Sequence, residues 1–122
     1  MRWLFFCIFV VLNLFTMAQI AEVKVDGNYA RIYGDDAMYS GHSVYLGSDK
    51  QLAGYNNQFL VIIESGYARV YDSNANYTGH SIRLGSDKTV KNVTFTNILI
   101  KEGIKTWYYD MKGDYTGKST SW

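Results

Sequence analysis

The sequence contains no proline and only one cysteine, Cys7, among its 122 residues. Without proline, the tight turns have to be made by the 11 glycines and by asparagine, aspartate and serine. Cys7 lies in an apolar N-terminal stretch that has the character of a cleavable leader. A chain without this stretch has no thiol, so neither a disulfide nor a cysteine nucleophile is available to it. It has to be stabilised by its apolar core alone.

An excess of charge of one sign is missing as well. The chain has 12 basic and 11 acidic residues, and its formal net charge at pH 7 is +1. No run of lysine or arginine overrides this balance locally. Nucleic acids and anionic membranes bind strongly basic surfaces. Neither is therefore expected as the main partner.

The first 18 residues have the pattern of a secretory signal. Arg2 precedes the apolar run Trp3–Leu12, and the small residues Thr16 and Ala18 precede the expected cleavage site. The run is shorter than the ~20 residues that are needed to span a bilayer. The sequence therefore predicts a signal peptide over 1–18 and a single secreted, extracellular domain over 19–122, with no membrane attachment after cleavage.

The rest of the chain consists of short alternating segments bounded by Gly, Asn, Asp and Ser, which is typical of an all-β domain. One pattern occurs three times at a spacing of 38 residues: tyrosine, five residues, tyrosine, one residue, glycine. Its nine positions are Tyr33, Tyr39, Gly41, Tyr71, Tyr77, Gly79, Tyr109, Tyr115 and Gly117. The spacing divides the domain into repeats of about 28–65 and 66–103 and a partial repeat over 104–122.

Two further expectations concern individual segments. Phe59–Ile63 is apolar at every position, which predicts a strand that is covered on both faces. The stretches 51–57 and 91–96 lack clear alternation and are expected to be loops. By the 38-residue offset, 22–25 supplies the last strand of a repeat, and 106–122 supplies the first two strands of another. We hypothesise that these two ends pair and close the molecule.

The tyrosine–glycine pattern resembles the Greek key motif of the βγ-crystallin superfamily. In that family an aromatic ring packs over a folded hairpin, and a glycine takes a positive φ that other residues rarely adopt. The present pattern has five residues between its aromatics, where the family has four. The resemblance implies two four-stranded Greek keys packed as a β-sandwich, with an extra C-terminal half-repeat. A β-trefoil is the alternative fold, because it also uses three repeats of about this length.

The same resemblance implies a calcium site. Many members of the family bind Ca²⁺ through a pair of Asn or Asp residues followed, after two residues, by hydroxyl side chains. Asn56 and Asn57 match the pair, but Leu60 and Val61 stand where the hydroxyls belong. Asn56 and Asn57 are therefore the candidate metal ligands of a degraded site, and no cofactor other than Ca²⁺ is expected.

The sequence offers no catalytic set. His42 and His80 occupy equivalent places after a motif glycine, and repetition alone explains them. No serine has neighbours that indicate an activating base. We therefore predict that the protein is not an enzyme.

Two kinds of surface site remain. Alternation predicts an outward Tyr/Arg face on two equivalent strands, which would suit recognition, although the tyrosines could instead face the second layer of the sandwich or pack over the hairpins. Two sequons lie in expected turns or loops and are candidates for N-glycosylation. The face consists of Tyr29, Arg31, Tyr67 and Arg69, and the glycan acceptors are Asn76 and Asn92.

These observations together predict a secreted, non-enzymatic βγ-crystallin-like protein with a structural or extracellular binding role. Its partner would be an extracellular protein or a glycan of unknown identity. The alternatives are a lectin-like, defence or inhibitor protein that uses the Tyr/Arg face, and a calcium-binding module with degraded sites.

Overall fold

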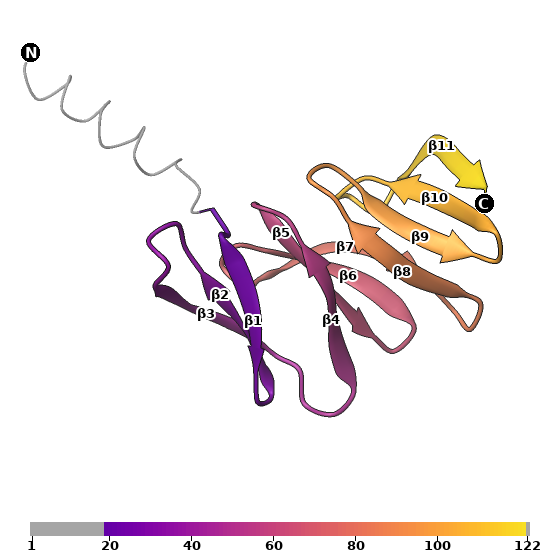
Figure 1. Ribbon diagram of the computed structural model, residues 1–122. Helices are drawn as coiled ribbons and strands as arrows, with labels where there is room; N and C mark the ends of the chain where they lie inside the picture. The colour runs from indigo at the N-terminus through magenta and orange to yellow at the C-terminus, as the bar shows by residue number, and fades with distance from the viewer. Residues whose placement is uncertain (1–18, 122) are drawn as a thin grey trace, which may run out of the picture.

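The computed structural model describes residues 19–121, and the predicted signal peptide lies outside this range. The described residues form eleven β-strands and no helix (Figure 1), which confirms the all-β prediction. The strands are β1 (Glu22–Asp26), β2 (Tyr29–Tyr33), β3 (Tyr39–Tyr45), β4 (Lys50–Tyr55), β5 (Phe59–Glu64), β6 (Tyr67–Asp72), β7 (Tyr77–Arg83), β8 (Lys88–Val93), β9 (Ile98–Glu102), β10 (Lys105–Tyr109) and β11 (Tyr115–Ser121). Residues 19–121 accordingly hold no helix that could span a bilayer.

The strands form three antiparallel sheets with the orders β1-β2-β3, β4-β5-β6-β7 and β11-β10-β9-β8. Hydrogen-bonded neighbours are always neighbours in sequence, so each sheet is a meander. For example, β5 and β6 are joined only by Ser65 and Gly66, whose φ values of 52° and 82° form a tight hairpin turn. A β-trefoil is built around a closed barrel, and no sheet of residues 19–121 closes, so that alternative is wrong.

Of the two stretches expected to be loops, residues 51–55 belong to strand β4 and residues 91–93 to strand β8. Each of these strands lies at the edge of its sheet and pairs with one neighbour only. Their registers shift, in β4 between Leu52 and Gly54 and in β8 between Val90 and Asn92. Such a bulge interrupts the alternation of side chains. For this reason the sequence pattern does not reveal these strands.

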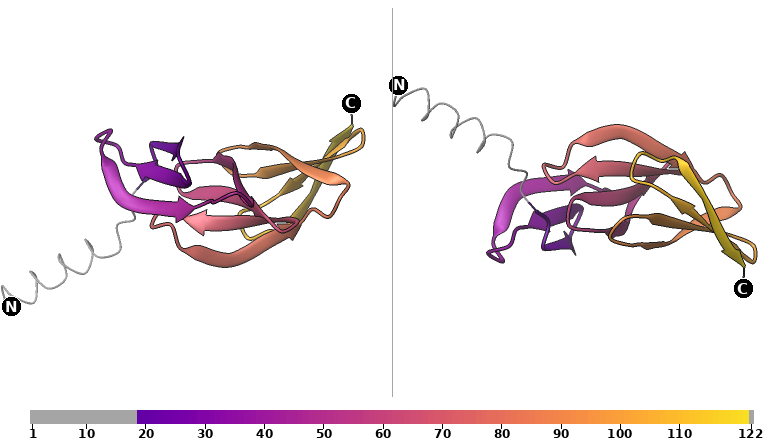
Figure 2. Two further views of the ribbon diagram at one scale, coloured as in Figure 1. Left: turned by 90° about the horizontal axis from the view of Figure 1, so that it is seen from below. Right: turned by 90° about the horizontal axis from the view of Figure 1, so that it is seen from above.

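The three sheets stack as layers, with the second sheet between the first and the third (Figures 1 and 2). On the central strand β5, Leu60 and Ile62 belong to the core shared with the first sheet, whereas Val61 belongs to the core shared with the third. All three side chains are 0% exposed. This confirms the prediction that Phe59–Ile63 is covered on both faces.

The folded hairpin has the same geometry in every layer. The ring centroids of the paired tyrosines lie 5.9, 5.6 and 5.8 Å apart in Tyr33–Tyr39, Tyr71–Tyr77 and Tyr109–Tyr115. The motif glycines Gly41, Gly79 and Gly117 have φ values of +87°, +87° and +91°. Only glycine adopts this backbone conformation at little cost. The repeated pattern therefore specifies a paired-ring hairpin three times over.

The hypothesis that the two ends of the domain pair is wrong. β1 pairs with β2 in the first sheet, and β10 pairs with β9 and β11 in the third. The second sheet lies between them, so the two segments are at opposite ends of the stack (Figure 2). The physical reason is that each segment already has a local antiparallel partner across a short turn.

Three charged side chains form an ion-pair chain on the second sheet. Lys50 Nζ lies 2.9 Å from Glu64 Oε2, and Arg69 Nε lies 3.6 Å from Glu64 Oε1. The hydrogen bond from Lys50 lowers the pKa of Glu64 below its ordinary value and raises the pKa of Lys50, while burial opposes both shifts. The ion pair therefore favours the charged form of both groups.

This pair is expected to make stability depend on pH. Because its pKa is lowered on folding, Glu64 stabilises the fold above its ordinary pKa of 4.5, and the contribution is lost as the pH falls through the folded pKa. Lys50 has a raised pKa, so its contribution is complete below 10.5 and is lost as the pH rises through the folded pKa. We expect Glu64→Gln to lower the free energy of unfolding by about 0.5–1 kcal/mol at neutral pH, and by less below about pH 4.

Urea unfolding of the wild type and of Glu64→Gln at neutral pH and at about pH 3 checks this expectation. A difference in unfolding free energy that is the same at both pH values would contradict it.

Candidate functional site

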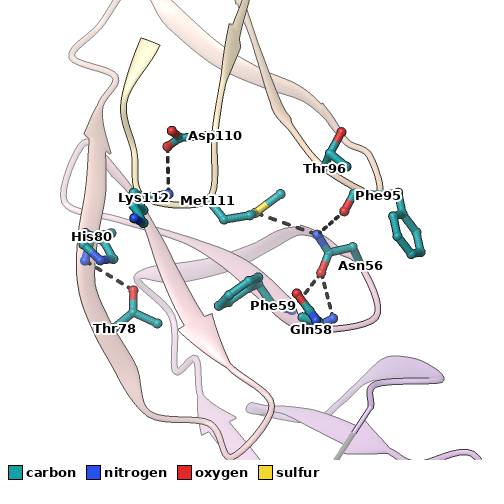
Figure 3. A pocket seen from close by; sticks show the side chains of 10 residues that line it. All are labelled: Asn56, Gln58, Phe59, Thr78, His80, Phe95, Thr96, Asp110, Met111 and Lys112. Atoms are coloured by element: carbon teal, nitrogen blue, oxygen red, sulfur yellow. Dashed lines mark hydrogen bonds between the residues drawn. The ribbon is translucent and has the colours of Figure 1, made fainter. Parts of the chain in front are cut away.

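A cleft of about 580 Å³ opens between the second and third sheets (Figure 3). It is lined by the β4–β5 turn, the start of β5, strand β7, the β8–β9 turn and the β10–β11 turn. The lining residues are Asn56, Gln58, Phe59, Thr78, His80, Phe95, Thr96, Asp110, Met111 and Lys112. Clefts of this size that combine apolar walls with a few polar groups are the usual form of small-ligand sites.

The side chain of Asn56 connects the two sheets beside the cleft. Its Nδ2 donates to the backbone oxygens of Thr94 and Phe95, at 3.3 and 3.1 Å. Its Oδ1 accepts from the backbone N–H groups of Gln58 and Phe59, at 2.9 and 2.8 Å. The amide therefore shapes its own turn and at the same time holds the β8–β9 turn of the next layer.

These bonds do not suit the predicted calcium site. Asn56 Oδ1 already accepts two N–H donors, and the backbone oxygen of Asn57 accepts the N–H of Ile20 at 2.8 Å. In the second copy, Thr94 Oγ1 accepts from Asn97 N at 3.0 Å, so it makes a turn of the same kind. Residues 19–121 also hold no group of three or more His, Cys, Asp or Glu residues able to coordinate a metal. The two residues therefore supply few of the six to eight oxygen ligands that Ca²⁺ requires, and the calcium site stays a prediction.

Aromatic and sulfur-containing side chains form the apolar part of the cleft. Phe59 and Met111 pack against the core between the second and third sheets. Phe95 is at the mouth in the β8–β9 turn, and it is 72% exposed. Figure 3 shows its ring beside the Asn56 amide and pointing away from the core. An exposed phenylalanine next to a cleft offers a flat apolar surface to a ligand.

Polar groups face these rings from the opposite side. Thr78 and His80 come from β7, and Asp110 and Lys112 come from the β10–β11 turn. Asp110 Oδ1 accepts the N–H groups of Lys112 and Asp114 at 2.9 and 3.0 Å, which leaves the second carboxylate oxygen for other partners. Thr78 Oγ1 donates to Val70 O at 2.8 Å. Its hydroxyl is therefore bonded to the backbone and not to the neighbouring imidazole.

Comparison with protein-family models, with curated proteins and with solved structures gave no match. The function of the cleft has to be argued from its own residues.

The predicted Tyr/Arg face is divided between two layers. Tyr29 and Arg31 lie on the outer face of the first sheet. Arg69 pairs with Ile62, and Ile62 belongs to the core shared with the first sheet, so Tyr67 and Arg69 lie on the side of the second sheet that faces the first. Each arginine stacks on tyrosines of its own sheet, with Arg31 Cζ 5.9 Å from the Tyr29 ring and Arg69 Cζ 5.7 Å from the Tyr67 ring. The four residues do not form one continuous outward face.

The two glycosylation candidates lie in different environments. Asn76 is exposed in the β6–β7 turn, as expected, and its N–H donates to Asp72 Oδ1 at 3.0 Å. Asn92 is also exposed, but it lies in the edge strand β8 and not in a loop. Its Oδ1 accepts the N–H of Val93 at 2.8 Å. Both asparagines remain candidates for glycan attachment.

The two histidines of the sequence pattern are separated as well. His42 lies in β3 of the first sheet, whereas His80 lies in β7 and lines the cleft. Sequence reasoning did not find Phe95, Asp110, Met111 or Lys112 as lining residues. Of these four residues only Phe95 stands out in the sequence, because it is an apolar residue in a polar turn. The third copy of the hairpin turn gave no indication that it would lie against β7.

Proposed function

We propose that the chain is a secreted, non-enzymatic binding protein that holds a glycan in the cleft between its second and third sheets. One observation carries the proposal: the exposed Phe95 ring at the mouth of a cleft whose opposite side carries hydroxyl, imidazole, carboxylate and ammonium groups. A sugar ring has an apolar face that stacks on an aromatic ring, and it has hydroxyls that hydrogen-bond to such polar groups. Gln58, Thr96 and Asp110 are placed to accept or donate these bonds (Figure 3).

The cleft supports binding better than catalysis. Among the residues that line the cleft, Thr78 and His80 most resemble a nucleophile–base pair. Thr78 donates its hydroxyl proton to the Val70 carbonyl, so the imidazole does not activate it. His80 then serves as a hydrogen-bonding group of the rim.

We also propose a relation to the βγ-crystallin superfamily. It is supported by three hairpins with paired tyrosine rings and a glycine at positive φ. A Greek key places its fourth strand beside its first, whereas the present sheets are meanders. The resemblance is therefore proposed for the folded hairpins and for the sandwich-like stacking of sheets, and not for the order of strands within a sheet.

A glycan array followed by titration of the best binder tests the proposed site. We expect Phe95→Ala to weaken binding by about tenfold or more, because the stacking partner is lost. The control is Tyr45→Ala, which removes a 55% exposed ring from the outer face of the first sheet and should leave binding unchanged. Addition of a chelator should also have no effect, because the proposed stacking and hydrogen bonds need no metal ion. A protein that binds nothing on the array, or a Phe95→Ala variant with unchanged affinity, would refute the proposal.

A further inference from the structure

The first and third sheets each carry one face that no described strand covers. On the first sheet this face is rich in tyrosine, and we call it the tyrosine face. Cross-strand pairing places Tyr29 between Asp26 and Tyr45, and Lys24 beside Arg31. Tyr29, Tyr39 and Tyr45 are 41%, 41% and 55% exposed. The face consists of Glu22, Lys24, Asp26, Tyr29, Arg31, Tyr33, Tyr39 and Tyr45.

The uncovered face of the third sheet carries lysines, and we call it the lysine face. Lys101 pairs with Thr106, and Thr106 pairs with Thr120 on β11. Lys118 Nζ lies 4.6 Å from the centre of the Tyr108 ring. A hollow of about 210 Å³ opens here between Lys91, Lys101, Ile104 and Thr106. The face consists of Thr89, Asn92, Leu99, Lys101, Ile104, Thr106, Tyr108, Lys118 and Thr120, and among these Leu99 and Thr106 are buried beneath their neighbours.

The 38-residue repeat relates these two faces to the contacts inside the molecule. Thr106 corresponds to Ala68 of the second sheet and to Ala30 of the first, and both alanines are 0% exposed under the next layer. Tyr29 corresponds to Tyr67, which lies on the side of the second sheet that faces the first. The lysine face is therefore the side on which a further layer would stack, and the tyrosine face is the side by which a layer joins the one before it.

The first and last layers also differ in charge. In residues 19–49 five acidic residues outnumber two basic ones, and in residues 88–121 six basic residues outnumber three acidic ones. The first group is Glu22, Asp26, Asp35, Asp36 and Asp49 against Lys24 and Arg31. The second group is Lys88, Lys91, Lys101, Lys105, Lys112 and Lys118 against Glu102, Asp110 and Asp114. The two ends of the stack therefore attract each other when they belong to different molecules.

We propose that a second copy of this chain docks head to tail, with its tyrosine face on the lysine face of the first copy. Lys101 and Lys118 would then meet tyrosine rings and the carboxylates of Glu22 and Asp26, in competition with Lys24 and Arg31, which pair with these carboxylates within the face. The tyrosine face carries no aliphatic side chain and the lysine face carries only Leu99 and Ile104, so the contact is weak and salt-dependent. Because each copy leaves one face of each kind free, association is open-ended and does not stop at a dimer.

Sedimentation of the chain over a range of concentrations tests this directly. In about 20 mM salt, the weight-average mass should rise with concentration beyond that of a dimer. In about 0.5 M salt, where charges are screened within a few ångströms, it should fall to that of a monomer. A chain that stays monomeric up to about 1 mM in low salt, or that stops at a dimer, would overturn the proposal.

Two double variants, each of which disables one of the two faces, sharpen the test. Tyr29→Ser with Tyr45→Ser removes rings of the tyrosine face, and Lys101→Glu with Lys118→Glu reverses the lysine face. Each double variant alone should be monomeric, whereas an equimolar mixture should form 1:1 dimers through the one intact face on each partner. Lys105→Glu with Lys112→Glu makes the same change in net charge away from the face, and it should weaken association much less than the lysine-face variant does. A mixture that stays monomeric, or a control variant that is as defective as the lysine-face variant, would reject the head-to-tail contact.

Discussion

Shortening Ile62 to alanine is expected to lower the free energy of unfolding by about 3–4 kcal/mol. Ile62 is 0% exposed and lies in the core between the first and second sheets. The layers above and below β5 restrict its movement, so the surrounding side chains have little freedom to fill the cavity. A loss of this size is a large part of the 5–15 kcal/mol that is typical of a small domain.

The neighbouring Val61 provides an independent measure of the second core. It is also 0% exposed, but it contacts the third sheet. We expect Val61→Ala to cost about 2–3 kcal/mol, and the double variant to lose the sum of the two values, because the two cavities share no partner. Ile104→Ala, at a position 71% exposed, should stay within about 0.5 kcal/mol of the wild type.

Urea unfolding followed by fluorescence measures these free energies. Equal, small losses for Ile62→Ala and Ile104→Ala would show that β5 is not enclosed between two layers. A double variant that is much less destabilised than the sum would show that the two cores are one.

Replacing Gly113 by alanine is the second change for which we expect a large effect, a loss of about 2–4 kcal/mol in unfolding free energy. Gly113 lies in the β10–β11 turn with a φ of +78°. A Cβ atom there would come within 2.7 Å of the Ser81 carbonyl oxygen on β7. Because this neighbour is backbone, the turn itself would have to move away from the second sheet. Such a movement would also displace Asp110 and Lys112 from the cleft.

The equivalent positions in the other two repeats show how much of the expected loss comes from the clash with Ser81 and how much from the positive φ. Ala37 and Ala75 occupy the equivalent turn positions with φ values of 61° and 64°, so this turn accepts a methyl group at positive φ. Gly117→Ala is the matched control, because its φ is +91° and a Cβ there would meet nothing within 4 Å. We expect it to cost only about 1–2 kcal/mol, from backbone strain.

The same unfolding experiment distinguishes these variants, and binding to the best glycan should fall in Gly113→Ala but not in Gly117→Ala. If both variants lost the same free energy, the close approach of the β10–β11 turn to β7 would be disproved.

The candidate site could be predicted from the sequence only in part. The asparagine pair was found, but its role was not, because Asn56 hydrogen-bonds to Thr94 and Phe95, which lie 38 and 39 residues away. A strand pattern shows which side chains share a face, and it does not show which layer covers that face. For the same reason the sequence placed Tyr29 and Tyr67 on one surface, whereas the stacking separates them.

The sequence by itself determined the features that depend on local chemistry. Alternation made the domain all-β, the tyrosine–glycine spacing specified three folded hairpins, and the apolar Phe59–Ile63 required cover on both faces. The tertiary structure decided the order of the sheets, the edge strands β4 and β8, and the cleft between the second and third layers. These features depend on contacts between segments far apart in the chain, and on small residues such as Gly113 that let one layer approach another. Such contacts leave no periodic signal in the sequence.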